Sequence, residues 1–231
     1  MPSGLPVYLS SLGECPYLPD RRWTLAVGAP RDLTAQQFDG FLSQGFRRMG
    51  KLIYVPRCQG CQACIPIRIP VRRFEFSKSQ RRVLRKNLDV TLTVGPPQFT
   101  PDRLDLYRKF LSVRYPDKTP PTSSEYLSFF VQELGFTQEF QYRVGDRLVG
   151  LGIVDVTTHA TSSVYFYFDP DQSRRSLGVY SLLQEISWCR ETGREFVYLG
   201  FYVEDCRAMN YKALYRPHER RQPDGSWTLF E

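Results

Sequence analysis

Three cysteines and a group of arginines lie close together between Cys58 and Asn87. Cys58, Cys61 and Cys64 have C-x2-C-x2-C spacing. Because one tight turn brings every third thiol to a common point, this spacing is typical of zinc sites and iron–sulfur clusters. The arginines that follow carry fixed positive charge, which suits phosphate groups. The segment therefore indicates a cysteine turn that leads into a surface for an anionic partner.

Three thiolates cannot close a tetrahedral metal site, so a fourth ligand is needed. We expect Cys15 to supply it, because a proline-stiffened loop holds this residue. The alternative is that these cysteines pack as free thiols. Cys189 is expected in the core, and Cys206 fits either role. The predicted ligands of a structural or regulatory zinc ion or iron–sulfur cluster are Cys15, Cys58, Cys61 and Cys64.

The positive charge of the chain is concentrated in its first part. The 231 residues carry a formal net charge of +7. Residues 1–100 hold 15 Lys/Arg against 6 Asp/Glu, a balance of +9, whereas residues 101–231 hold 16 against 18, a balance of −2. This asymmetry favours a nucleic-acid partner for the first part over a merely soluble basic surface. No signal-peptide pattern and no apolar run of membrane-spanning length is present, so we expect a cytoplasmic protein with no membrane partner.

Periodicity and capping patterns predict a mixture of helices and strands. Residues 1–14 are expected to form an extended arm, and 65–76 to be broadly extended. A domain boundary is predicted at Gly95-Pro96-Pro97, which separates residues 1–95 from residues 96–231. The expected helices are 34–44, 79–88, 101–115, 123–134, 177–192 and 209–215, and the expected strands are 46–56, 88–94, 137–144, 148–157, 163–168 and 196–200.

A strand-to-helix turn in the second part could bind an anion. The segment from Tyr167 to Gly178 ends a strand, passes Arg174 and Arg175, and begins a helix near Leu177. Amide groups at a helix start can hold an anion, and an arginine can assist them. This local plan is similar to the acyl-carrier site of the GNAT acyltransferase superfamily. Together with the order of elements, it predicts a mixed sheet flanked by helices.

Many short motifs in order make the chain resemble the arginyl/leucyl-tRNA–protein transferase family, in particular its short bacterial branch, the aspartate/glutamate leucyltransferases. The resemblance covers nearly the whole chain. It implies an α/β (α+β) GNAT-like acyltransferase fold with a Cys-containing basic N-terminal region. The motifs are Cys15-Pro16-Tyr17-Leu18, Gly45-Phe46-Arg47-Arg48, Cys58-x2-Cys61-x2-Cys64-x-Pro66-x-Arg68, Ser79-Gln80-Arg81-Arg82-x2-Arg85-x-Asn87, Tyr167-Phe168-Asp169-Pro170, Arg175-Ser176-Leu177-Gly178, Tyr198-Leu199-Gly200-x-Tyr202, Met209-Asn210-Tyr211-Lys212 and Tyr215-x-Pro217-x-Glu219.

The resemblance implies transfer of leucine from Leu-tRNA to proteins that begin with Asp or Glu, which marks them for N-degron degradation. An aminoacyl ester is already activated, so positioning supplies much of the rate and the chemistry requires no cofactor. No DNA partner is expected. The candidate catalytic residues are Tyr198, Gly200, Tyr202 and Tyr211, with packing at the sheet edge as the alternative role of the tyrosines. The candidate substrate- and tRNA-binding residues are Arg47, Arg48, Arg81, Arg82, Arg85, Asn87, Arg174, Arg175, Ser176, Gly178, Asn210 and Lys212.

Other activities fit less of the chain. An arginyl donor is the alternative within the family, because no donor pocket can be read from the residues. A non-enzymatic zinc-knuckle RNA-binding protein would use only the first hundred residues. A small-molecule N-acetyltransferase would need an Arg-x2-Gly-x-Gly loop that is not present. The two histidines, His159 and His218, stand in no triad-like context, which disfavours Ser/Cys–His hydrolysis.

Overall fold

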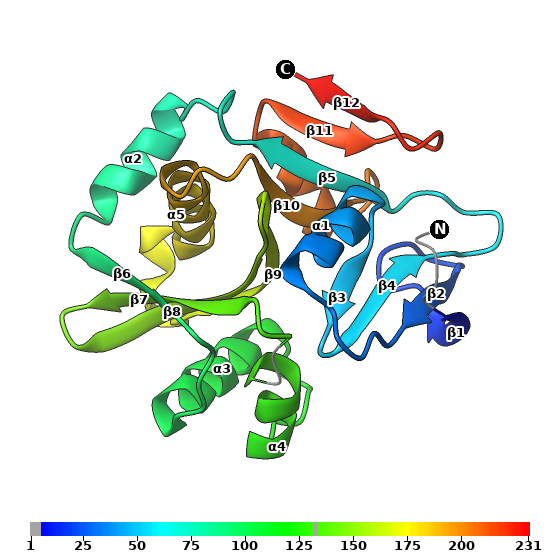
Figure 1. Ribbon diagram of the computed structural model, residues 1–231. Helices are drawn as coiled ribbons and strands as arrows, with labels where there is room; N and C mark the ends of the chain where they lie inside the picture. The colour runs from blue at the N-terminus through cyan, green and yellow to red at the C-terminus, as the bar shows by residue number, and fades with distance from the viewer. Residues whose placement is uncertain (1–5, 132–133) are drawn as a thin grey trace.

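The computed structural model describes residues 6–131 and 134–231 (Figure 1). No helix in these ranges is both long and apolar enough to cross a bilayer. The strands are β1 Val7–Glu14, β2 Arg22–Gly28, β3 Arg47–Met49, β4 Leu52–Pro56, β5 Ile65–Pro70, β6 Val90–Gly95, β7 Thr137–Val144, β8 Arg147–Val156, β9 Ala160–Phe168, β10 Phe196–Tyr202, β11 His218–Arg221 and β12 Trp227–Phe230. The helices are α1 Ala35–Ser43, α2 Lys78–Lys86, α3 Pro101–Arg114, α4 Ser123–Tyr126, the π-helix η1 Leu127–Val131, the 3₁₀ turn η2 Pro170–Arg175, α5 Leu177–Glu191, α6 Arg207–Asn210 and the 3₁₀ turn η3 Tyr211–Leu214.

An eight-stranded mixed sheet forms the centre of the molecule. Its strand order is β12-β11-β5-β10-β9-β8-β7-β6. Strands β9 and β10 run parallel, whereas the other neighbouring pairs are antiparallel. The parallel pair is joined through α5, as the crossover rule requires. This arrangement confirms the predicted mixed sheet flanked by helices.

Helices cover both faces of this sheet (Figure 1). On one face, Tyr180 of α5 packs in a cluster with Tyr142 and Val149. On the opposite face, Leu104 of α3 packs in a cluster with Leu151 and Ile153. Strand β8 is therefore buried on both sides, and its run of apolar residues from 148 to 154 reflects that position.

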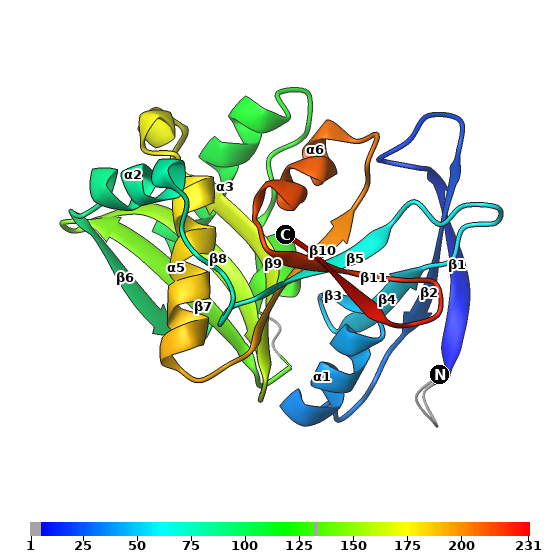
Figure 2. The same cartoon turned by 90° about the horizontal axis from the view of Figure 1, so that it is seen from above.

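A smaller antiparallel sheet, of order β1-β2-β4-β3, lies beside the large one (Figure 2). Helix α1 packs on it through Phe38, Phe41 and Leu42, and the same cluster includes Tyr198 from β10. The large sheet takes strands from both sides of the predicted boundary after residue 95, because β6 pairs with β7 and β5 pairs with β10. Residues 1–95 and 96–231 therefore share one sheet, and buried clusters take residues from both ranges.

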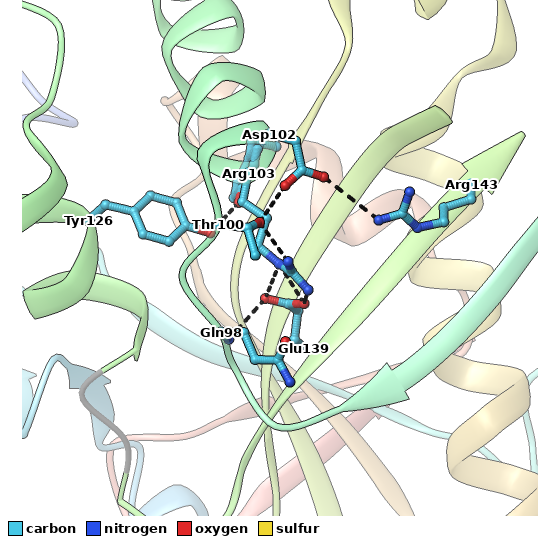
Figure 3. Close-up of polar contacts among 8 residues, drawn as sticks. Gln98, Thr100, Asp102, Arg103, Tyr126, Glu139 and Arg143 are labelled. Carbon is cyan, nitrogen blue, oxygen red and sulfur yellow. Dashed lines mark hydrogen bonds and ion pairs between the residues drawn. The ribbon is translucent and has the colours of Figure 1, made fainter. Parts of the chain in front are cut away.

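A buried ion pair attaches the start of α3 to β7 (Figure 3). Arg103 and Glu139 are 5% and 0% exposed, and their closest nitrogen and oxygen atoms are 2.7 Å apart. The backbone N–H of Gln98 donates to the same carboxylate at 3.4 Å. Because every polar atom of such a pair needs a partner, this network fixes the connection that leads from β6 into α3.

Local sequence signals located many elements correctly. Thr34 and Gln37 form the predicted capping box of α1, and α3, β7 and α5 lie close to their predicted bounds. Three predicted segments differ from the structure. Of the extended arm predicted at residues 1–14, residues 1–5 lie outside the described ranges, and Val7–Glu14 form β1, a strand paired with β2. The strand predicted at 46–56 is the hairpin of β3 and β4, with a turn at Gly50. Thr122 caps α4 in place of Ser123 or Ser124, and α4 continues as the π-helix η1; residues 132 and 133 of the predicted helix lie outside the described ranges.

Candidate functional site

Strands β9 and β10 separate part of the way along their length. Their parallel pairing covers Phe196–Tyr198 opposite Ala160–Ser162. Beyond these residues β9 continues to Phe168 and β10 to Tyr202 without pairing to each other. We call this place the β9–β10 opening. The carboxyl ends of neighbouring parallel strands are where open sheets bind ligands, so the opening is the first candidate for the active site.

Arg47 connects the two strands where they separate. Its Nη1 donates to Ser162 Oγ at 2.8 Å and to Tyr198 O at 3.2 Å, and its Nη2 donates to Ser163 O. The side chain comes from β3 of the smaller sheet and is only 8% exposed. Burial lowers the pKa of Arg47 from its ordinary value. Because arginine stays protonated in proteins even so, the guanidinium places a positive charge at the base of the opening.

Gly200 bends β10 toward this arginine. The register between β10 and β5 shifts between Tyr198 and Gly200, and the φ angle of Gly200 is +86°. A Cβ at this position would lie 3.5 Å from Arg47 Nε. Glycine is therefore required here for the backbone conformation, and it leaves the strand backbone close to the guanidinium.

Lys212 lies beside the same segment of β10. Its Nζ donates to Phe201 O at 2.7 Å and lies 3.5 Å from Met209 Sδ. The residue is 8% exposed. Burial, together with the charge of Arg47, lowers the pKa of Lys212 to about 7. At neutral pH this amine is therefore partly uncharged and able to accept a proton.

The candidate catalytic tyrosines occupy different environments. Tyr198 is 5% exposed, and its hydroxyl accepts from Arg68 Nη1 at 2.9 Å. Tyr202 is 7% exposed and packs beneath Arg220. Tyr211 is 48% exposed. Sequence reasoning did not assign a site role to Arg68, which also pairs with Glu219 at 2.6 Å. The position of Arg68 in the motif Pro66-x-Arg68 was the sequence signal that could have indicated such a role.

Two further predicted binding residues, besides Arg47 and Lys212, are engaged inside the protein. Arg48 is 5% exposed and pairs with Asp155 at 2.8 Å, so its guanidinium is not available to tRNA. Asn87 is 1% exposed and donates to the carbonyls of Val83 and Arg175. Both assignments to tRNA contact are corrected, because charge and polarity in the sequence did not reveal burial.

Helix α2 and the start of α5 form one basic surface. Arg81, Arg82 and Arg85 are exposed on α2, and no carboxylate in the described ranges forms an ion pair with them. Asn87 joins this helix to the loop before α5 through its bond to Arg175 O. Figure 1 shows α2 alongside α5, at the side of the molecule where β9 leads into that helix. The structure thus brings two separately predicted anion-binding segments together.

The segment before α5 differs in detail from the expected anion site. Arg175 is paired with Asp89 at 2.7 Å, which reduces its contribution to anion binding. Ser176 has a φ angle of 57° and makes no side-chain cap bond. Gly178 lies in the first turn of α5, where no neighbour lies within 4 Å of an added Cβ. Asn210, at the end of α6, donates to Glu204 O at 3.0 Å.

The four predicted metal ligands are free thiols of intermediate exposure. Burial first, and then the nearby thiols of Cys15, Cys58 and Cys61, raise the pKa of Cys64 to about 12. The four side chains thus share one region between the loop of Cys15 and the cysteine turn. In the described ranges no three His, Cys, Asp or Glu side chains are arranged to hold a metal ion. The donor chemistry fits zinc or an iron–sulfur cluster, but the turn would have to close around the ion.

Comparison with known proteins identifies relatives over nearly the whole chain. The family model "Arginine-tRNA-protein transferase, N terminus" matches residues 13–82, and "Arginine-tRNA-protein transferase, C terminus" matches residues 102–222. An aspartate/glutamate leucyltransferase of Pseudomonas putida (strain W619) is 36% identical over 218 residues, 93% of each chain. That of Saccharophagus degradans is 39% identical over 219 residues, again 93% of each chain.

Solved structures resemble the chain only distantly. FemX has a TM-score of 0.48 and 8% identity, with coverage of 87% of this chain and 81% of FemX. L-PGS from Bacillus licheniformis has a TM-score of 0.43 and 16% identity, with coverage of 62% and 48%. Scores below 0.5 do not establish a shared fold.

Proposed function

Since this chain belongs to the arginyl/leucyl-tRNA–protein transferase family, an aminoacyltransferase family, we propose that it moves leucine from Leu-tRNA to proteins that begin with Asp or Glu. The observation that carries the proposal is the 36–39% identity to aspartate/glutamate leucyltransferases over 93% of each chain. The proposed product is a protein marked for degradation by its new N-terminal leucine, and the proposed compartment is the cytoplasm. An arginyl donor is the second candidate, because the matching family models are named for arginine.

The reaction exchanges an ester for an amide. The acceptor α-amine attacks the leucyl carbonyl, the new C–N bond forms, and the C–O bond to the tRNA ribose breaks. The amine must lose its proton, and the departing ribose oxygen must gain one. An α-amine has a pKa of about 8, so only modest base assistance is needed. Positioning of amine and ester supplies much of the remaining rate.

We place this reaction at the β9–β10 opening. Lys212 is assigned as the proton acceptor, because its amine is buried and partly neutral near pH 7. Arg47 is assigned to stabilise negative charge that develops on the carbonyl oxygen, either directly or through the strands that it holds. Gly200 keeps the backbone of β10 close to both groups. The three residues come from three different elements, so the fold assembles the site.

The basic surface of α2 is proposed to bind the tRNA backbone. Replacing Arg81, Arg82 and Arg85 together with glutamine should weaken Leu-tRNA binding and flatten its salt dependence. Each lost phosphate contact removes roughly 0.7–0.9 from the slope of log K against log salt concentration. Filter binding at several salt concentrations measures this slope. An unchanged slope would exclude α2 from the tRNA path, and Arg31→Gln, which removes one exposed charge elsewhere, is the matched control.

We further propose that Cys15, Cys58, Cys61 and Cys64 bind one zinc ion or iron–sulfur cluster that joins the N-terminal loop to the cysteine turn. Protein purified without oxygen should contain metal, and Cys15→Ser should lose it together with stability of the smaller sheet. Zinc, iron and sulfide per chain are the quantities to measure. Cys206→Ser is the control, because this residue lies outside the proposed set. Metal-free wild type with full activity would contradict the proposal.

A further inference from the structure

Three consecutive hydroxyl side chains lie on β9 where it leaves β10, and each of them has a defined partner. Thr161 Oγ1 donates to Glu185 Oε1 at 2.7 Å, and Ser163 Oγ donates to Glu185 Oε2 at 2.6 Å. Ser162 Oγ instead accepts from Arg47 Nη1 at 2.8 Å. Successive side chains of a strand point to opposite faces. Glu185 therefore holds β9 from the face that α5 covers (Figure 1), and Arg47 holds it from the other face.

Glu185 is a buried acidic residue without a direct ionic partner. It is 5% exposed, and no Lys, Arg or His side chain of residues 6–131 and 134–231 forms an ion pair with it. Burial raises the pKa of Glu185, whereas the two hydroxyl hydrogen bonds and the charge of Arg47 act in the opposite direction. A buried carboxylate is costly unless other groups compensate its charge. Packing alone would be served as well by an apolar side chain, so the acidic group requires an electrostatic explanation.

The two buried arginines of β3 are balanced in charge only when Glu185 is included. Arg48 is paired directly with Asp155, and their closest nitrogen and oxygen atoms are 2.8 Å apart. Arg47 donates to three neutral oxygens and forms no ion pair with the described part of the chain. Its charge and that of Glu185 nevertheless act on each other across β9. Since Asp155 already has a partner, Glu185 is the buried carboxyl group that remains to compensate Arg47.

We propose that Glu185 is a positioning residue, whose carboxylate balances the buried charge of Arg47 and fixes β9 through its two hydroxyl hydrogen bonds. The effect on catalysis rests on the proposed leucyltransferase function, in which Arg47 stabilises charge on the leucyl carbonyl oxygen. Because Glu185 is buried beneath α5, it acts on the reaction through Arg47 and β9 and touches no substrate. The alternative is a protonated, neutral Glu185 that only satisfies the hydroxyls of Thr161 and Ser163.

Glu185→Gln distinguishes a charged side chain from a neutral one. Glutamine has nearly the shape of a protonated glutamic acid, and it also combines an acceptor oxygen with a donor group. A charged Glu185 predicts that Glu185→Gln raises the equilibrium constant for unfolding at least about tenfold and lowers kcat for transfer at least about tenfold. The KM for Leu-tRNA should stay unchanged, because the tRNA is proposed to bind at α2. Urea unfolding and steady-state kinetics measure these quantities, and a variant with wild-type stability or wild-type kcat overturns the proposal.

A double-mutant cycle with Arg47 shows whether the two charges act on each other. In the Arg47→Met background Glu185 has lost the charge that it balances, so Glu185→Gln should neither destabilise the protein nor lower kcat further. Thr161→Val is the matched control, because it removes one hydrogen bond to the same carboxylate and leaves both charges in place. Its effect on stability should be similar in both backgrounds. An equal cost of Glu185→Gln in the two backgrounds would mean that Glu185 acts independently of Arg47, which overturns the proposal.

The unfolding experiments require no tRNA, so they separate this proposal from the function on which it rests. If wild type transfers no leucine and the cycle still shows coupling, the proposed function fails and the charge balance between Glu185 and Arg47 stands. If wild type transfers leucine and the cycle shows no coupling, the function stands and the proposal is overturned. Where a single variant does not fold, recovery of folding in Arg47→Met/Glu185→Gln supports the proposal, and a double variant that remains unfolded overturns it.

Discussion

Replacing Arg47 with methionine should reduce leucine transfer by at least about 10²-fold and lower the free energy of unfolding by about 1–3 kcal/mol. The side chain is almost fully buried, and it donates to Ser162, Ser163 and Tyr198 across the line where β9 and β10 part. Methionine fills similar space but leaves these buried acceptors without hydrogen-bond donors. Each acceptor has then lost its contact with water and gains no hydrogen bond in return, which destabilises the folded state. Transfer is measured in single turnover at a temperature where circular dichroism shows the variant folded.

Arg47→Lys separates charge from geometry. Lysine keeps the positive charge but lacks the planar fork that reaches both strands. We expect it to recover part of the stability and little of the transfer rate. Arg31→Met is the matched control, because Arg31 is exposed and lies away from the opening. Transfer by Arg47→Met at the wild-type rate would show that this side chain has no role in the reaction.

Lys212→Met should lower kcat for transfer by about 10²-fold or more and make the protein more stable at neutral pH. The pKa of Lys212 is lowered to about 7, whereas the pKa of a lysine in the unfolded chain is about 10.4. Between these values the unfolded chain binds a proton that the folded chain does not. The destabilisation is therefore complete below pH about 7, shrinks as the pH rises, and vanishes above pH about 10.4. Stability measured by urea unfolding should show the gap between variant and wild type closing over that range.

The pH profile of kcat tests the same residue independently. In wild type, kcat should rise as the pH passes about 7, because only the neutral amine accepts a proton. Lys212→Met should lose that rise. Lys212→Arg keeps a charged side chain that cannot lose its proton near neutral pH, so it should be as inactive as the methionine variant. An active Lys212→Arg enzyme with an unchanged profile would assign the base elsewhere.

Much of the local structure could be predicted because its signals are local. The capping box of α1 uses Thr34 and Gln37, three residues apart, and was visible in the sequence. The strand β7 and the helix α5 follow from continuous periodic segments. By contrast, β1 is half exposed and depends on pairing with β2, so its sequence resembles an extended arm. The hairpin of β11 and β12 at the C-terminal end was missed because each strand has only four residues and β11 is polar.

The residues of the candidate site were predicted only in part, and the errors in that prediction have one physical cause. Sequence patterns showed which arginines exist but not which are buried. Arg47 and Arg48 are adjacent, yet Arg47 joins two strands while Arg48 pairs with Asp155, 107 residues away. The lowered pKa of Lys212 likewise depends on burial and on the charge of Arg47, which come from a distant part of the chain. Such properties arise only when the two sheets pack together.

The most direct test of the central claim is a transfer assay with labelled Leu-tRNA and Arg-tRNA. Each is offered with peptides that begin with Asp, Glu, Arg or Lys, and the modified N-terminus is identified by mass spectrometry. We expect leucine on the Asp and Glu peptides and no transfer to the basic ones. Exclusive use of Arg-tRNA, or leucine transferred only to Arg and Lys peptides, would contradict it.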